Sequence, residues 1–210
     1  MTHAISRSQL LLPFSLAGVA LAEAEAALTV LREEAGVSSV VLTLGSSAAA
    51  DELLSGACGV GARLGVCVGV EVGCAQDLAA AAAAGARFVL LRRPASTADE
   101  SAAQIFSEAA RIGLTIPIIP VVGDNTELDS AVASHGSAMF LWDGEAGPGV
   151  VGDEEYGGTL RFICDSSSVE SAEECMRRAD GSGVLGVWGS WLAAGSAEEV
   201  AAASARLRPP

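Results

Sequence analysis

Lysine is absent from this chain of 210 residues, and all twelve of its basic residues are arginine. A Schiff base between a protein side chain and a carbonyl substrate forms on a lysine amine. The sequence therefore excludes this covalent chemistry for the side chains of the protein. A genome that favours arginine over lysine explains the composition without a functional cause, and it leaves the chemical consequence unchanged.

Basic residues are also too few to balance the acidic ones, so the formal net charge is −14. Proteins that bind nucleic acid or anionic membrane surfaces need a basic stripe or patch, and this chain has none. We therefore expect neither partner. The sequence contains no unbroken apolar run of about 18 residues, which argues against a transmembrane helix.

Ligands for a zinc site are scarce. The only histidines are His3 and His135, and the five cysteines form no C-x-x-C pair. No zinc site or Ser-His-Asp triad is therefore indicated, we expect no cofactor, and we expect a structural role for His135 at the end of a helix. Apolar neighbours around the cysteines indicate reduced thiols in a cytoplasmic protein; these are Cys58, Cys67, Cys74, Cys164 and Cys175.

Half of the residues are hydrophobic, which is enough for a sizeable core in a single domain over residues 1–210. The stretch Leu114–Leu128 shows the unit that repeats along the chain. An apolar, β-branched strand ends at Gly123, Asp124 and Asn125 can cap a helix, and Glu127 opens it. Serine or threonine followed three residues later by glutamate predicts further helix starts at Thr97/Glu100, Ser167/Glu170 and Ser196/Glu199.

Eight such units predict an α/β protein with the (β/α)₈ TIM-barrel fold, in a compact form with eight parallel strands. An open doubly wound sheet is the alternative, but its dinucleotide fingerprint is missing. The strands are expected at residues 9–15, 38–44, 63–70, 86–91, 114–123, 137–142, 159–164 and 184–188. The helices are expected at residues 21–35, 48–59, 74–84, 97–112, 126–135, 167–181 and from 196 onwards.

Three segments allow other interpretations. Leu10–Ala22 carries no charge and ends in Ala-Leu-Ala, as a secretory signal does, but cleavage there would remove a strand that the barrel needs; we favour the strand. Pro117 and Pro120 cannot donate to a ladder, although the flanking pattern still favours a strand. Residues 146–158 are rich in glycine and acidic residues and are expected to form a loop.

Four segments carry a likeness to a known family: Val40-Val-Leu-Thr-Leu44, Ala84-Gly-Ala-Arg-Phe88, Ile116-Pro-Ile-Ile-Pro120 with Thr126-Glu-Leu128, and Gly189-Ser-Trp-Leu192. From about Pro13 to Leu192 the chain resembles the 2-keto-3-deoxy-6-phosphogluconate (KDPG) and 4-hydroxy-2-oxoglutarate (KHG) aldolases. The resemblance implies a (β/α)₈ barrel, a homotrimer and a pocket for a small carboxylate or phosphate ligand. Such enzymes release pyruvate through a strand-six lysine and a strand-two glutamate.

At the matching positions the catalytic residues of that family are missing. Phe140 stands where the resemblance places the lysine, Val41 stands at the glutamate, and Gly45 stands at the arginine after it. The strand-three motif becomes Val68-Gly-Val-Glu71, and the glycine pair after strand seven becomes Ser166-Ser167. We therefore predict an aldolase-like barrel without Schiff-base chemistry, either a pseudoenzyme or a module that binds a small anion.

Polar residues directly after the strands would meet at the carboxyl end of the barrel, where the sites of this fold lie. Glu71, Asp143 and Asp165 could share a divalent cation, which would permit a metal-dependent lyase acting on 2-oxo acids. In the alternative interpretation each is a solvated carboxylate or a helix cap, and Asp165 is well placed to cap. The sequence does not establish a metal site.

Other residues at that end suggest anion binding. Arg92 could hold a carboxylate or phosphate, or neutralise an acidic rim, whereas Arg93 is expected to face solvent. Ser166, Ser167, Gly189 and Ser190 could bind a phosphate through backbone N–H groups, or the serines could be ordinary caps. Trp142, Trp188 and Trp191 fall at strand ends, where they could line a pocket but more often pack in a core or a trimer interface.

Overall fold

The computed structural model describes residues 10–43, 50–91, 102–135, 137–143, 160–178, 184–193 and 195–207. Within these ranges nine strands form one sheet in which every neighbouring pair is parallel. The strands are β1 Leu10–Ser15, β2 Ser39–Thr43, β3 Cys67–Val72, β4 Phe88–Leu91, β5 Ile118–Ile119, β6 Val121–Val122, β7 Met139–Trp142, β8 Arg161–Asp165 and β9 Val184–Trp188.

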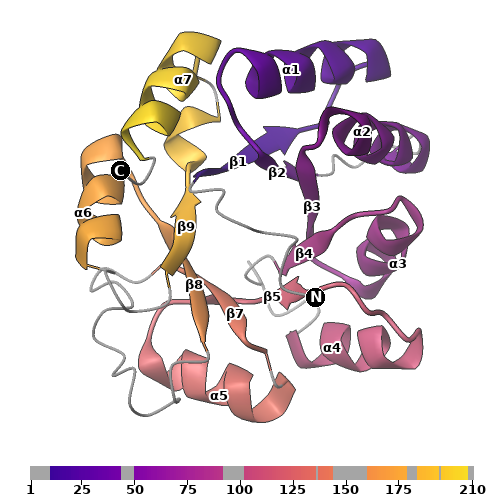
Figure 1. The fold of residues 1–210 in the computed structure, drawn as a ribbon. Coiled ribbons are helices and arrows are strands. Elements are labelled where there is room, and N and C mark those ends of the chain that lie inside the picture. Colours follow the sequence, from indigo (N-terminus) through magenta and orange to yellow (C-terminus); the bar gives the residue numbers. More distant parts are fainter. Residues whose placement is uncertain are drawn as a thin grey trace.

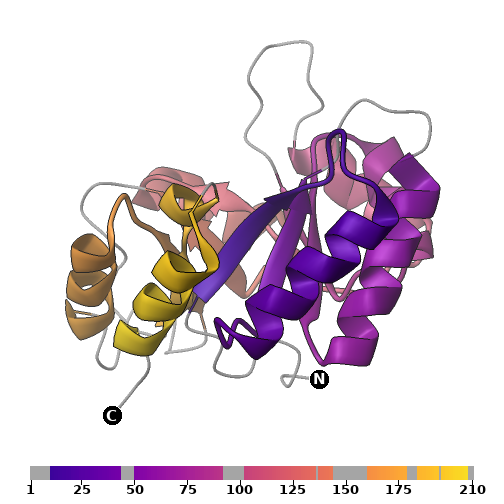
Figure 2. The ribbon, with the colours of Figure 1, turned by 90° about the horizontal axis from the view of Figure 1, so that it is seen from above.

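Helices alternate with these strands and lie outside them (Figure 1). They are α1 Leu21–Glu33, α2 Ala50–Leu64, α3 Ala75–Ala83, α4 Ala102–Arg111, α5 Asn125–His135, α6 Val169–Arg178 and α7 Ala197–Arg206, with the short 3₁₀ helix η2 at Ser190–Leu192. Seen from above, the helices again flank the strands on their outer side (Figure 2). His135 ends α5, as the sequence predicted.

The sheet closes into a barrel at Pro120. In the strand order β5-β4-β3-β2-β1-β9-β8-β7-β6, the two outermost strands are separated in sequence by this one residue. Strands β5 and β6 thus form one interrupted strand that pairs with β4 on one side and β7 on the other. The predicted TIM barrel with eight strand positions is confirmed, and β1 lies between β2 and β9, as the strand interpretation of Leu10–Ser15 requires.

The two prolines take part in the barrel through their carbonyl groups. Val89 N–H donates to the Pro117 carbonyl at 2.9 Å, and Leu141 N–H donates to the Pro120 carbonyl at 3.0 Å. A proline lacks an N–H group but keeps its acceptor. The prolines therefore shorten the ladder on this strand without opening the sheet.

Alternation along the strands separates an inner from an outer core. The inner core contains strand residues alone, namely Leu11, Val41, Phe88, Leu90, Ile119, Leu141, Ile163 and Trp188. The outer cores fill the space between strands and helices; one includes Leu28 of α1 and Leu78 of α3, and another includes Leu128 of α5. The barrel interior is thus packed with apolar side chains.

The helix α2 is longer than predicted, and β3 is shorter. The sequence placed the helix at 48–59 and the strand from Arg63, whereas α2 runs from Ala50 to Leu64 and β3 begins at Cys67. The predicted helix thus ended at Gly59, before the last turn of α2. Gly61 instead packs against Val68, and Gly65, with φ +69°, allows the turn into the strand.

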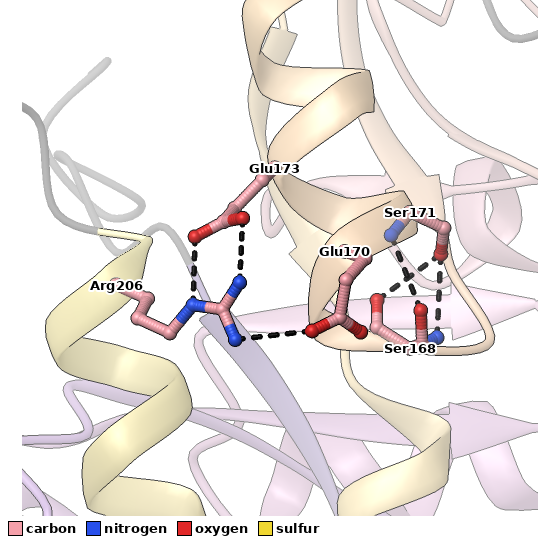
Figure 3. Close-up of polar contacts among 5 residues, drawn as sticks. All are labelled: Ser168, Glu170, Ser171, Glu173 and Arg206. Atoms are coloured by element: carbon pink, nitrogen blue, oxygen red, sulfur yellow. Dashed lines mark hydrogen bonds and ion pairs between the residues drawn. The ribbon is translucent and has the colours of Figure 1, made fainter.

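The cap of α6 is one residue later than predicted. Ser168 and Ser171 exchange bonds: the Ser171 N–H donates to Ser168 Oγ, and the Ser168 N–H donates to Ser171 Oγ, each at 3.2 Å (Figure 3). Ser167 and Glu170 do not form the expected box. The predicted capping box at Ser196/Glu199 is confirmed: Glu199 Oε2 accepts from the Ser196 N–H at 2.7 Å, and Ser196 Oγ accepts from the Glu199 N–H. The box predicted at Thr97/Glu100 lies outside the described residues.

Glu170 instead helps to join the last two helices. Arg206 of α7 binds Glu173 with two nitrogens, at 2.8 and 2.7 Å, and Glu170 with a third, at 3.1 Å (Figure 3). The two-pronged geometry is the strongest form of an arginine–carboxylate contact. No helix in the described ranges is long and apolar enough to span a membrane.

Candidate functional site

Three acidic residues lie at the carboxyl ends of the strands, as the sequence predicted. Glu71 is the fifth residue of β3 and half-buried, Asp143 directly follows β7, and Asp165 ends β8. Each is two residues beyond an inner position, Gly69, Leu141 or Ile163, so each side chain belongs to the inner side of its strand. These carboxylates therefore surround the mouth of the barrel.

Asp165 holds the end of β8 against the start of η2. Its Oδ1 accepts from the Ser166 N–H at 2.8 Å, and the Ser190 hydroxyl lies at 3.5 Å from the same oxygen. The second contact is at the limit of a hydrogen bond, so the hydroxyl can turn to another acceptor at little cost. Because Ser168 caps α6, the interpretation of Asp165 as the cap of that helix is wrong.

The surroundings of Asp165 favour its neutral form. Shielding of the carboxyl group from water raises its pKa above 3.8, and the charge of Asp143 raises it further. Bonds from the Ser166 N–H and the Ser190 hydroxyl lower the pKa in part. A change of pH or a second negative charge nearby would therefore change the protonation of Asp165.

The metal hypothesis lacks its third ligand. Asp143 and Asp165 interact electrostatically, but the described residues, which include Glu71, contain no group of three histidine, cysteine, aspartate or glutamate side chains placed to hold one ion. Hard cations such as Mg²⁺ or Ca²⁺ need several oxygen ligands on one point. A metal-dependent lyase therefore has no preformed site in this part of the chain.

Ser166, Ser167, Gly189 and Ser190 were predicted to bind an anion through their backbone N–H groups, but two of these groups donate hydrogen bonds within the fold. The Gly189 N–H donates to the Leu11 carbonyl at 2.8 Å, and the Ser166 N–H is taken by Asp165. The N–H groups of Ser167 and Ser190 have no acceptor in the described part of the chain, and both residues are exposed. Ser167 and Ser190 are therefore the members of this group with a free backbone donor.

The position of Phe140 contradicts the sequence interpretation. Phe140 is fully buried in the outer core against Leu128 and Ala131 of α5, and its ring lies 6.0 Å from that of Phe162. It does not face the pocket that the resemblance implied. The side chains of this strand that pack in the interior are Met139 and Leu141, while Val41 does face the interior, as expected for its strand.

The tryptophans have three different environments. Trp142 is buried in the outer core, with its ring edge-on to Phe162 at 6.1 Å, and Trp191 packs half-buried against the outer core. Trp188 alone of the three belongs to the inner core, beside Asp165 in the ladder between β8 and β9. The predicted anion ligand Arg92, its neighbour Arg93 and Gly45 lie outside the described residues.

Two hydroxyl residues at the mouth were missed. Ser15 and Thr43 are paired at the carboxyl ends of β1 and β2, and Thr43 is two residues beyond the inner Val41. Ser15 is the last residue of the strand predicted at 9–15, which was a signal for it, whereas the strand predicted at 38–44 runs one residue beyond Thr43 and gave no such signal.

Comparison with solved structures supports the barrel fold. The chain matches the KDPG aldolase of Zymomonas mobilis ZM4 with 3-phosphoglycerate at TM-score 0.69 and 16% identity, covering 97% of this chain and 92% of that one. It matches the Legionella pneumophila enzyme, which holds pyruvate as a covalent carbinolamine, at TM-score 0.63 and 18% identity over 97% and 94%. The thiamine phosphate pyrophosphorylase of Pyrococcus furiosus matches at TM-score 0.65 and 14% identity over 96% and 94%.

No family model and no curated protein matches the sequence. The identities of the structural matches are low, and the fold they share carries enzymes with different names. Fold does not decide function. The function of this protein therefore depends on the residues at the mouth of its barrel.

Proposed function

We propose that this protein is a KDPG-aldolase-like barrel that binds a small carboxylate or phosphate compound at its mouth and lacks Schiff-base aldolase activity. The observation that carries the proposal is chemical: the chain has no lysine, and the described side chains that fill the interior beneath the mouth are mostly apolar, with the buried Ser39 as a polar exception. Without an amine the carbinolamine cannot form on a side chain, and the covalent route is closed.

Exposed donors at the mouth support an anionic ligand. The N–H groups of Ser167 and Ser190 and the Ser190 hydroxyl lie after β8 and β9, next to Asp165. Backbone N–H groups of this kind bind carboxylate and phosphate oxygens. The matched aldolases were solved with 3-phosphoglycerate and with pyruvate, both small anions, which agrees with the ligand class proposed.

The acidic mouth makes such binding depend on pH. An anion beside Ser190 lies close to the Asp165 carboxyl group, so the two negative charges repel each other while Asp165 is ionised. Protonation of Asp165 removes this repulsion and provides an additional donor. Affinity should therefore rise as the pH falls through the raised pKa of Asp165.

Calorimetric titration of the full chain with pyruvate, and separately with inorganic phosphate, tests the binding. We expect affinity to increase about tenfold per pH unit at most in the wild type and to become independent of pH in Asp165→Asn. Ser190→Ala should weaken binding. Glu33→Gln, an exposed carboxylate at the far end of α1, is the matched control and should behave as the wild type. Absence of heat with both anions at every pH would refute the proposed binding.

Borohydride reduction in the presence of pyruvate tests the second half of the proposal. We expect no covalent adduct by mass spectrometry and no pyruvate release from 2-keto-3-deoxy-6-phosphogluconate. Either product would show that the covalent reaction takes place without lysine. By the same resemblance we propose a homotrimer, which native mass spectrometry can test. The unpaired cysteines favour a cytoplasmic protein, which cell fractionation can test.

A further inference from the structure

A cleft lies on the outer side of β1, between the first and the last helix. Helices α1 and α7 are neighbours beside this strand in both views (Figures 1 and 2). The volume of the cleft is about 340 Å³, and the buried side chains of Leu12, Leu192 and Val200 form its floor. Because Leu11 belongs to the inner core, Leu12 faces outward, and the cleft is separated by the strand from the barrel interior.

Small residues keep the two helices from filling this space. On α1 the lining includes Ala26 and Ala27, and on the opposite side it includes Gly195 and Ala197, at the start of α7. Closely packed helices interdigitate larger side chains, which alanine and glycine do not provide. A recess lined by apolar atoms therefore remains between α1 and α7, of a size that is usual for small-molecule sites.

The lining of the cleft disfavours a charged ligand. None of the described residues around it has a polar side chain, and Phe14 and Leu31 in its walls pack half-buried against the outer core. At the rim, the Glu199 carboxylate lies beside Gly195 and accepts from the Ser196 N–H at 2.7 Å. An anion in the cleft would lose its hydration and be repelled by Glu199. The cleft therefore suits an uncharged, apolar ligand, unlike the mouth.

The surroundings of the cleft indicate a small molecule rather than a protein partner. A stable protein interface buries roughly 800 Å² on each partner, with an apolar centre. Among the described residues, only Leu21 and Ile112 are large, hydrophobic and exposed. Leu21 lies against Gly56 of α2, and Ile112 follows α4, so neither lines the cleft. The apolar surface open to a ligand is thus confined to the recess itself.

We propose that this cleft binds an uncharged, apolar aromatic molecule of about two to three rings. An apolar cavity of about 150 Å³ takes up benzene, and this cleft has roughly twice that volume. Binding would remove the apolar surfaces of Leu12, Phe14 and Leu31 from water, which is the favourable contribution expected here. The proposal does not depend on anion binding at the mouth, because the cleft lies outside the ring of strands.

Fluorescence titration of the full chain with N-phenyl-1-naphthylamine tests the proposal. This uncharged probe emits more strongly in apolar surroundings, and we expect saturation at one probe per chain. The sulfonated probe 8-anilinonaphthalene-1-sulfonate has the same rings and one negative charge. It should bind at least about fivefold more weakly, because of the charge of Glu199 at the rim. Saturating pyruvate or phosphate should not displace the uncharged probe.

Two substitutions on α1 should close the cleft. Ala27→Phe places a ring within it and should weaken binding of the uncharged probe at least about tenfold, because the space is then overpacked. Ala26→Phe changes an exposed position at the rim, so it should weaken binding in the same direction without disturbing the core. Ala79→Phe, at an exposed position of α3, is the matched control and should bind as the wild type does.

The possible results separate this proposal from the one for the mouth. The cleft proposal is wrong if the uncharged probe does not bind, if both α1 variants bind it as the wild type does, or if pyruvate displaces it. Equal affinity for the sulfonated probe would contradict an uncharged ligand. Calorimetry with pyruvate should give the same result for Ala26→Phe and the wild type, whatever that result is, because the substitution is outside the barrel.

Discussion

Asp165 is a side chain whose charged form is disfavoured in the folded protein. Its pKa in the folded protein is above 3.8, mainly because the carboxyl group is shielded from water. When the folded pKa is the higher one, the folded state binds the proton more tightly than the unfolded state does. Ionisation of Asp165 therefore lowers the free energy of unfolding.

The expected pH dependence follows from this sign. Below the unfolded pKa both states are protonated and the penalty is absent; it develops as the pH rises through the folded pKa. We expect Asp165→Asn to raise the free energy of unfolding at neutral pH by less than about 1 kcal/mol, because the carboxyl group is only partly shielded from water and solvent screens its charge. Urea unfolding of both proteins between about pH 4 and 7 measures the difference. A penalty that increases towards low pH would contradict the argument.

At the same scale, the sequence predicted where residues lie along the chain better than where they point. The positions of Glu71, Asp143 and Asp165 after their strands were correct. The orientation of Phe140 was wrong, because Met139, Phe140, Leu141 and Trp142 are all apolar. In a strand that is buried on both faces, hydrophobicity does not alternate, so the pattern cannot reveal the inner side.

At the scale of single elements, α2 shows that glycine does not always end a helix. The helix contains Gly56, Gly59 and Gly61 and continues to Leu64, whereas the sequence predicted its end at Gly59. Gly59 is exposed and has nothing near the place of a Cβ atom. At Gly61 a Cβ atom would overlap Val68 Cγ2 of β3, so this glycine brings helix and strand close together.

The two glycines therefore predict opposite effects of one substitution. Gly59→Ala should stabilise the protein by about 0.4–1 kcal/mol, because alanine restricts the unfolded chain and favours a helix. Gly61→Ala should destabilise it by about 1–3 kcal/mol, because the stiff Val68 side chain has to move. Chemical denaturation of both variants gives the comparison within a single helix. Equal shifts in the two would disprove the close-packing role of Gly61.

For the whole molecule, the repeated strand–helix unit was enough to predict the barrel. Buried strands, capping residues and the count of eight units agreed with one another, and such agreement across levels is what specifies a fold. The site was less predictable. It depends on contacts between distant segments, such as Asp165 with Ser190, and on side-chain direction, neither of which a local pattern contains.

Pro120 lies at a place where few backbone hydrogen bonds hold the barrel closed. On either side of it, β5 and β6 contribute two residues each, whereas β2 pairs along five residues with both of its neighbours. Transient opening of the barrel should occur here, because few backbone bonds have to break; the two-residue ladder between β1 and β9 is equally short. In deuterated water the amides of Val89 and Leu141, which depend on the two prolines, should exchange before those of Val41 and Leu42. The route by which solvent first enters this protein would then pass between its fourth and sixth strand positions.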